Sequence, residues 1–214
     1  MRCVITGANR GIGAALTHQM RARGDQVWGT ARNGSCDIAL DVTDATAQAA
    51  MAHHLDGQPL DLLVCNAGIY PDRGERLADG YAPALWADGF ATNVTGVFLS
   101  VQALLPNLQL GTQARIAIIS SQMASHSRAP GGSYIYRASK AAALNLGRNL
   151  AADLAGLDIA VGIYHPGWVQ TDMGGGAADI DTDTAAAGLI ARFDALSLAT
   201  TGCFETWDGT PHPY

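Results

Sequence analysis

Tyr136 and Lys140 form a Tyr-x-x-x-Lys pair whose residue types and spacing could support acid–base chemistry. Residues four apart lie on one face of a helix, so the phenol and the ammonium group would be neighbours there. A phenol has a pKa of about 10, and a nearby positive charge favours the phenolate and lowers that pKa. Tyr134 stands six residues before the lysine and would point elsewhere. An ordinary amphipathic helix has the same spacing, so the pair alone leaves both interpretations open.

Glycines gather where the first predicted strand ends, in the segment TGANRGIG at 6–13. Gly7, Gly11 and Gly13 would allow a tight turn there and let the N–H groups at the start of a helix approach a pyrophosphate. The spacing is G-x-x-x-G-x-G rather than the commoner G-x-G-x-x-G, and a glycine-rich turn without a ligand could share it. Its place directly after a strand favours a dinucleotide site.

Small and polar residues also follow two later strands. Asn66, Ala67 and Gly68 end the fourth predicted strand and offer a small polar platform. After the third strand, Asp41 could accept a hydrogen bond from an adenine amino group, whereas Asp44 is expected to be a helix N-cap. Because ligands bind at the carboxyl ends of the strands in open α/β sheets, these segments are expected to share one site.

The elements that would position these residues alternate along the chain. Short β-rich runs are apolar throughout, as in a parallel sheet covered on both faces, and Ala- and Leu-rich helical stretches separate most of them. This pattern predicts a Rossmann-type doubly wound α/β sandwich with a seven-stranded parallel sheet, in one domain over 1–214. The predicted strands are 2–6, 26–30, 36–40, 60–66, 114–120, 159–165 and 201–205. The predicted helices include 11–23, 93–108 and 133–156, and Pro106 and Asn107 are expected to end the second of these.

The composition narrows the classes of partner. Hydrophobic residues make up 48% of the 214 residues and charged residues 15%, which allows a large core. The net charge is −6 and no basic run occurs, so neither nucleic acid nor a membrane is an expected partner. The first strand leaves no room for a targeting peptide and no apolar stretch approaches a membrane span, so a cytoplasmic protein is expected. Cys3, Cys36, Cys65 and Cys203 lack metal-ligand spacing, so buried free thiols and no metal are expected.

Taken together, the motifs resemble those of the single-domain short-chain dehydrogenase/reductase family over essentially the whole chain. TGANRGIG, CNAG at 65–68, NVTGVF from Asn93, ISS at 119–121, YRASK at 136–140 and HPGWVQT at 165–171 occur in that family's order. The compact length, YRASKAAALN and the ending FETWDGTPHPY are most similar to its C-factor-like subgroup. The resemblance implies hydride transfer between a nicotinamide and a small to medium carbonyl or alcohol substrate. The resemblance also allows an alternative function, a signalling or regulatory protein of the C-factor type that binds NADP and whose catalytic turnover is incidental.

The resemblance implies a role for individual residues. Tyr136 would exchange a proton with the substrate oxygen, Lys140 would lower the tyrosine pKa and hold the nicotinamide ribose, and Asn93 would hold a proton-relay water. The implied cofactor contacts are Gly7, Asn9, Arg10, Gly11, Ile12, Gly13, Arg32, Asp41, Val42, Asn66, Ala67, Gly68, Tyr136, Lys140, Pro166, Gly167, Val169 and Thr171. Tyr134 is expected to pack or to line the mouth of the pocket.

The serine of the family's catalytic set needs a choice. Ser121, the second serine of Ile-Ser-Ser, would hydrogen-bond the substrate oxygen. It lies fifteen residues before Tyr136, whereas about thirteen is common, which we interpret as two extra residues in the loop around PGGSY. Ser120 and Ser125 remain alternatives. Cys65 stands where many members carry asparagine, and it is expected to pack in the sheet without affecting the chemistry.

Two arginines indicate the cofactor. The second predicted strand closes as GTARN, so Ala31 stands where relatives that prefer NAD commonly carry aspartate. Arg32 follows it, and Arg10 lies where relatives that prefer NADP often place a second basic residue. An arginine fork can hold a 2′-phosphate with two charge-assisted hydrogen bonds, so NADP(H) is the predicted cofactor.

The predicted helices also indicate assembly. The segments 93–109 and 133–155 resemble the helices with which family members build a dimer interface, and Ala141, Ala142 and Ala143 would allow close helix approach. A homodimer or homotetramer is therefore expected.

Overall fold

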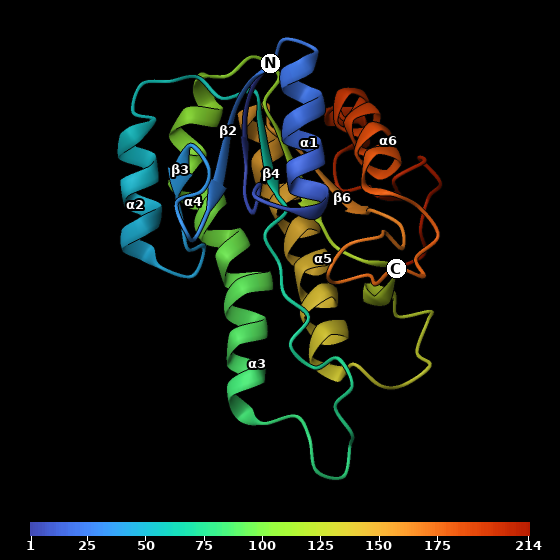
Figure 1. Cartoon of the computed structure of the whole chain (residues 1–214). Helices are drawn as coiled ribbons and strands as arrows, with labels where there is room; N and C mark the ends of the chain where they lie inside the picture. Colours follow the sequence, from blue (N-terminus) through green and yellow to red (C-terminus); the bar gives the residue numbers. More distant parts are fainter.

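The computed structural model describes residues 1–214 and contains one seven-stranded parallel sheet with helices on both faces (Figure 1). The strand order is β3-β2-β1-β4-β5-β6-β7, and every neighbouring pair is parallel. The strands are β1 (Arg2–Ile5), β2 (Gln26–Ala31), β3 (Ile38–Ala39), β4 (Leu62–Cys65), β5 (Arg115–Ile119), β6 (Ala160–His165) and β7 (Phe204–Thr206). The predicted Rossmann-type doubly wound sandwich is confirmed. The order reverses between β1 and β4, which is where such sheets open a ligand crevice.

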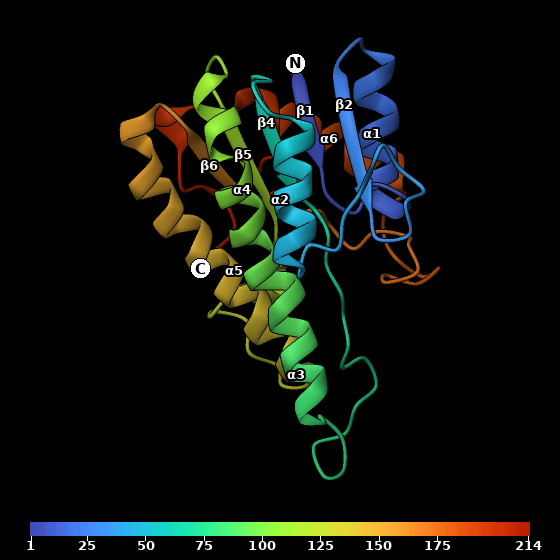
Figure 2. The same cartoon turned by 90° about the vertical axis from the view of Figure 1, so that its left-hand side faces the viewer.

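The helices form two layers, which the second view separates (Figure 2). α1 and α6 pack on one face of the sheet, and α2, α4 and α5 cover the other. The α-helices are α1 (Gly11–Ala22), α2 (Ala45–His54), α3 (Pro83–Phe90), α4 (Gly96–Leu110), α5 (Tyr134–Leu154) and α6 (Thr182–Ala195). A π-helical segment, η1 (Ala91–Thr95), joins α3 to α4, and a short 3-10 turn, η2 (Gln122–Ala124), follows β5.

The uniformly apolar strands follow from this double cover. In β1, Val4 faces the layer of α2, α4 and α5, while Cys3 and Ile5 face the layer of α1 and α6, and all three are buried. Successive side chains point to opposite faces of a sheet, so each strand needs apolar residues at consecutive positions.

The four thiols differ from the expectation in part. Cys3 and Cys65 are buried, and burial raises the pKa of each thiol to about 12. Cys36 and Cys203 are only half-buried, because they lie in the turns that precede β3 and β7 rather than inside those short strands. None of the four forms a disulfide.

The long helical run from α3 to α4 corrects two expectations. The helix does not end at Pro106 and Asn107 but continues to Leu110. Pro106 lies on the exposed side of the helix. The Asn107 amide donates to the Leu55 and Gln58 carbonyls at 2.6 and 2.9 Å. Residues 83–110 are also long and apolar enough to cross a membrane by length and composition. In this fold, however, the apolar side of α4 packs in the core against the sheet.

Candidate active site

The glycine segment forms a turn that other residues could not. Gly7 has a φ of +67°, and a Cβ there would lie 3.0 Å from the Cα of Ala67 on the neighbouring strand end. A Cβ at Gly13 would lie 2.2 Å from the carbonyl oxygen of Gly7. The backbone of α1 therefore starts directly against the end of β1, which opens the sheet edge to a ligand.

The start of α1 is ready to bind an anion. Arg10 is its N-cap residue and makes no side-chain capping bond, and the first turn carries no acidic residue. The N–H groups of an uncapped first turn have no intrahelical partner, and the helix dipole favours negative charge beside them. A cofactor pyrophosphate fits this site, because phosphate oxygens would satisfy those donors.

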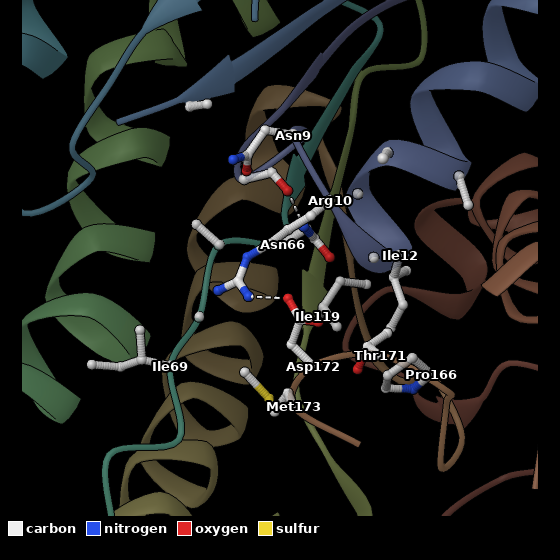
Figure 3. Close-up of a pocket in the computed structure, with 18 of the residues that line it drawn as sticks. Asn9, Arg10, Ile12, Asn66, Ile69, Ile119, Pro166, Thr171, Asp172 and Met173 are labelled. Atoms are coloured by element: carbon white, nitrogen blue, oxygen red, sulfur yellow. Dashed lines mark hydrogen bonds and ion pairs between the residues drawn. The ribbon is translucent and has the colours of Figure 1, made fainter. Parts of the chain in front are cut away.

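A cavity of about 840 Å³ runs from this turn along the carboxyl ends of the strands (Figure 3). Most of the predicted cofactor residues line it: Gly7, Asn9, Arg10, Gly11, Ile12, Gly13, Arg32, Asp41, Val42, Asn66, Ala67, Gly68, Tyr136, Lys140, Pro166 and Thr171. Gly167 and Val169 do not. A Cβ at Gly167 would meet Ile180 at 2.6 Å, and Val169 is buried and bridges to the same residue. Both pack beneath the cavity wall, which their position in the motif HPGWVQT could not reveal.

Two of the predicted cofactor contacts, Asn66 and Asp41, also form hydrogen bonds to other residues of the protein. The Asn66 amide donates to the carbonyls of Thr6 and Gly7 at 2.9 and 3.0 Å, so it holds the glycine turn against β4. The Asp41 carboxylate accepts from the N–H and hydroxyl of Thr43, which holds its pKa below the usual value. Asp44 accepts from the N–H of Thr46 at 2.7 Å and is the N-cap of α2, as predicted.

Tyr136 and Lys140 lie together on the buried face of α5. The ammonium nitrogen is 5.7 Å from the centre of the phenol ring and donates to the carbonyl of Ile119 at 2.9 Å. Burial lowers the pKa of Lys140 to about 8. Burial also raises the pKa of Tyr136 to about 12, and the nearby Ser121 hydroxyl only partly opposes this. The sequence predicted a lowered pKa for Tyr136; in the protein alone, burial of the phenol raises that pKa instead.

The structure separates the three candidate serines. Ser121 follows β5 and accepts from the N–H of Met123 at 3.1 Å. Its hydroxyl also interacts with the Tyr136 phenol and favours a lower pKa there. Ser120 instead donates to the carbonyl of Lys140 at 3.0 Å. Ser125 donates to the carbonyl oxygen of Tyr214 at 3.3 Å. Only Ser121 stands beside the tyrosine, although it does not itself line the cavity.

Asn93 lies in the π-helical segment η1 and is buried behind the cavity. Its amide accepts from the N–H of Ile69, donates to the Ile69 carbonyl, both at 2.9 Å, and donates to the Ser139 hydroxyl at 3.0 Å. A Cβ on Gly68 would lie 3.2 Å from the amide oxygen of Asn93 and 3.4 Å from the Lys140 nitrogen. Asn93 therefore lies beside Lys140 and fixes the loop that follows β4 at Ile69.

The two arginines expected at the 2′-phosphate line the same cavity but differ in their partners. Arg32 makes no ion pair. Arg10 reaches across the cavity mouth to the carboxylate of Asp172 (Figure 3). Sequence reasoning missed Asp172, although it directly follows Thr171, because nothing in the sequence places an acid opposite the glycine turn.

Comparison with known proteins identifies the class that this fold and site define. The family model described as short chain dehydrogenase matches residues 2–180, so the chain belongs to the short-chain dehydrogenase/reductase family. Over 167 residues it is 35% identical to the protein named C-signal from Myxococcus xanthus, covering 77% of this chain and 99% of the relative. It is 30% identical over 210 residues to the 3-oxoacyl-(acyl-carrier-protein) reductase FabG of Escherichia coli (strain K12), covering 91% and 82%.

Solved structures give the same answer for the fold. The NADPH-bound carbonyl reductase from chicken fatty liver superposes with a TM-score of 0.90 at 29% identity, covering 100% of this chain and 98% of that one. The carbonyl reductase Sniffer of D. melanogaster gives 0.92 at 26% identity, covering 100% and 99%. An NADP-bound short-chain dehydrogenase/reductase from Burkholderia multivorans gives 0.87 at 27%, covering 100% and 99%. The predicted family is confirmed.

Proposed function

We propose that this chain transfers hydride between NADP(H) and a small to medium, partly apolar carbonyl or alcohol substrate. The observation that carries the proposal is that Tyr136 and Lys140 line the same cavity as the glycine turn. A dinucleotide cleft with an acid–base pair in its wall is the arrangement that such a reaction requires. The similarity to the NADPH-bound carbonyl reductase supports this choice of chemistry.

In this proposal the protein orients the substrate and moves one proton, while bound NADPH supplies the hydride. Tyr136 donates its phenolic proton to the substrate oxygen during reduction. Its pKa of about 12 in the protein alone keeps the phenol protonated at neutral pH. Ser121 hydrogen-bonds the same oxygen and stabilises the charge that develops on it. Lys140 holds the nicotinamide ribose, and Asn93 fixes the backbone beside it, where a proton-relay water would be held.

We further propose that NADP(H) is preferred over NAD(H). Arg32 is unpaired beside Ala31, at the end of β2, and is available for an adenosine 2′-phosphate. No acid occupies position 31 to accept from a free 2′-hydroxyl. Arg10 is the second cation of this proposal, once it leaves Asp172.

A screen for NADPH oxidation over a panel of aldehydes and ketones tests the proposed function, with NADH run in parallel. We expect turnover of at least one carbonyl class by the wild-type chain, with a lower KM for NADPH than for NADH. Binding of NADPH without turnover of any carbonyl, or of any alcohol in the reverse direction, would overturn the enzymatic proposal.

A second candidate is an NADP-binding signalling or regulatory protein with incidental turnover. The 35% identity to the protein named C-signal is the observation that favours it. The same screen separates the two candidates, because a sensor predicts cofactor binding with little or no turnover. The proximity of Asn93, Ser121, Tyr136 and Lys140 in the fold favours the enzyme.

For the assembly we propose a homodimer or homotetramer that forms through the layer of α4 and α5. Phe98 on α4 is 42% exposed, which supports an apolar contact surface there. Light scattering at micromolar concentration tests it, and a monomeric mass would count against it. We also propose a reducing compartment, the cytoplasm, in which the free thiols persist.

A further inference from the structure

The helix that carries Tyr136 has no cap from its own neighbourhood. Ser133 is the N-cap residue of α5 but adopts a left-handed backbone with a φ of +51°, and its side chain makes no capping bond. The Ser133 hydroxyl instead bonds the phenol of Tyr70. The first N–H groups of α5 are buried, so they need acceptors from elsewhere in the chain.

Asp72 supplies those acceptors from 63 and 64 residues away in the sequence. One carboxylate oxygen accepts from the N–H of Ile135 at 2.8 Å, and the other accepts from the N–H of Tyr136 at 3.2 Å. The Asp72 residue is 1% exposed and pairs with no basic side chain. Its charge is therefore balanced by the start of the helix alone, through charge-assisted hydrogen bonds and the helix dipole.

The segment Ile69–Asp72 is itself held at its other end. Asn93 bonds both the N–H and the carbonyl of Ile69. The ring of Tyr70 stacks on the ring of Tyr136, with centres 4.3 Å apart and an interplanar angle of 19°. In Figure 1 the loop after β4 runs along the lower end of α5. The short span Ile69–Asp72 thus joins Asn93, the residue beside Lys140, to the backbone N–H of Tyr136.

We propose that Asp72 is a positioning residue that fixes the Tyr136 phenol by anchoring the tyrosine's own backbone. This inference rests on the proposed role of Tyr136 in proton transfer. A reacting group displaced by about 1 Å can cost about a hundredfold in rate, so loss of the anchor acts on kcat rather than on ligand binding. Asp72 touches neither the cavity nor the phenol oxygen, and its effect passes through the helix start.

Asp72→Ala and Asp72→Asn test the proposal, with Asp44→Ala as the matched control. Asp44 also caps a helix with its carboxylate, but α2 carries none of the proposed catalytic residues. All proteins are assayed at a temperature where circular dichroism shows them folded, since Asp72→Ala removes both acceptors. Asp72→Asn keeps one acceptor and the side-chain volume, so it serves if the alanine variant does not fold.

We expect kcat to fall at least tenfold in Asp72→Asn and further in Asp72→Ala, with the NADPH Kd and substrate KM within about twofold of wild type. Asp44→Ala should lower the Tm without changing kcat. Hydrogen exchange should lose protection at the Ile135 and Tyr136 amides only in the Asp72 variants. Unchanged kcat, retained amide protection, or an equal loss of NADPH affinity would overturn the proposal. A wild-type chain that turns over nothing refutes the proposed function instead, and amide exchange alone then decides whether Asp72 anchors Tyr136.

Discussion

The guanidinium of Arg10 lies 2.6 Å from the carboxylate of Asp172, across the mouth of the cofactor cavity and 162 residues along the chain. Next to this pair, Arg73 donates to the carbonyl of Met173 at 3.0 Å. Two arginines from separate loops therefore hold the segment that follows Thr171. Arg10 is also one of the two arginines that the sequence assigns to the 2′-phosphate, so the Asp172 carboxylate and the phosphate would compete for this cation.

Asp172→Asn should strengthen NADPH binding by about 1.4- to fivefold and leave NADH binding unchanged. The substitution removes the competing anion, and an exposed ion pair of this kind contributes about 0.2–1 kcal/mol. Fluorescence titration of both cofactors measures the change. Equal effects on NADPH and NADH would show that Asp172 acts on the cavity in general and not on the phosphate through Arg10.

Arg32→Ala should weaken NADPH binding by about ten- to a hundredfold, because a hydrogen bond to a charged group contributes about 1.5–3 kcal/mol. NADH binding should stay nearly the same, since it lacks the phosphate. Ala31→Asp should shift the preference toward NADH by repelling the phosphate. Steady-state KM values for both cofactors test the two variants. A wild-type enzyme that prefers NADH would contradict the assignment of Arg32.

Tyr136→Phe should abolish turnover while leaving the NADPH Kd within about threefold of wild type, because it removes one oxygen from the proposed proton path. Tyr134→Phe is the matched control. Tyr134 is 39% exposed and packs edge-on against Tyr81, away from the lysine, so most activity should remain. A Tyr136→Phe variant that keeps its activity would remove the central assumption of the mechanism.

Ser121→Ala should lower kcat by about 10²–10³, the range for the loss of one donor to a developing oxyanion. Ser125→Ala should have a small effect, because that hydroxyl bonds the carbonyl oxygen of Tyr214 instead. Turnover of the best carbonyl substrate compares the two. A larger loss of kcat in Ser125→Ala than in Ser121→Ala would assign the hydrogen bond to the substrate oxygen to Ser125.

Stability should fall on acidification because His165 is buried. Burial lowers its pKa to about 4, His212 and Arg128 add to this, and Asp208 opposes it. The unfolded chain binds this proton near pH 6.5 and the folded protein only near pH 4. The contribution of neutral His165 to the free energy of unfolding is therefore fully present above about pH 6.5. It is lost as the pH falls to 4, and the loss is up to about 3 kcal/mol.

The comparison with His165→Gln isolates that effect from the carboxylates that titrate in the same range. Urea unfolding at a series of pH values measures both proteins. The wild type should lose more of its free energy of unfolding than the variant between pH 6.5 and 4. Parallel curves would show that His165 gains its proton equally well in the folded and unfolded states.

Local signals were enough to predict the sheet and much of the cavity. The strands are apolar throughout because helices cover both faces of the sheet, and this pattern can be seen in the sequence. Gly7 and Gly13 can also be seen there, because the turn that they form leaves no room for a Cβ. The anchoring of Tyr136 by Asp72 and the pairing of Arg10 with Asp172 could not be predicted. Each joins segments far apart in the sequence, and an aspartate in a loop has no local feature that reveals its distant partner.

The π-helical segment η1 has a consequence for which sequence changes the fold can accept. A π turn contains one residue more than an α turn, so a single deletion within Ala91–Thr95 could restore a regular helix. Each residue of an α-helix turns it by about 100°, so the deletion would rotate α3 about its axis relative to α4. Gly89 would then leave Ile135, against which a Cβ would stand only 2.7 Å away. The extra residue therefore sets the angular register of α3, and apart from Asn93 this stretch should tolerate substitution far better than any change in length.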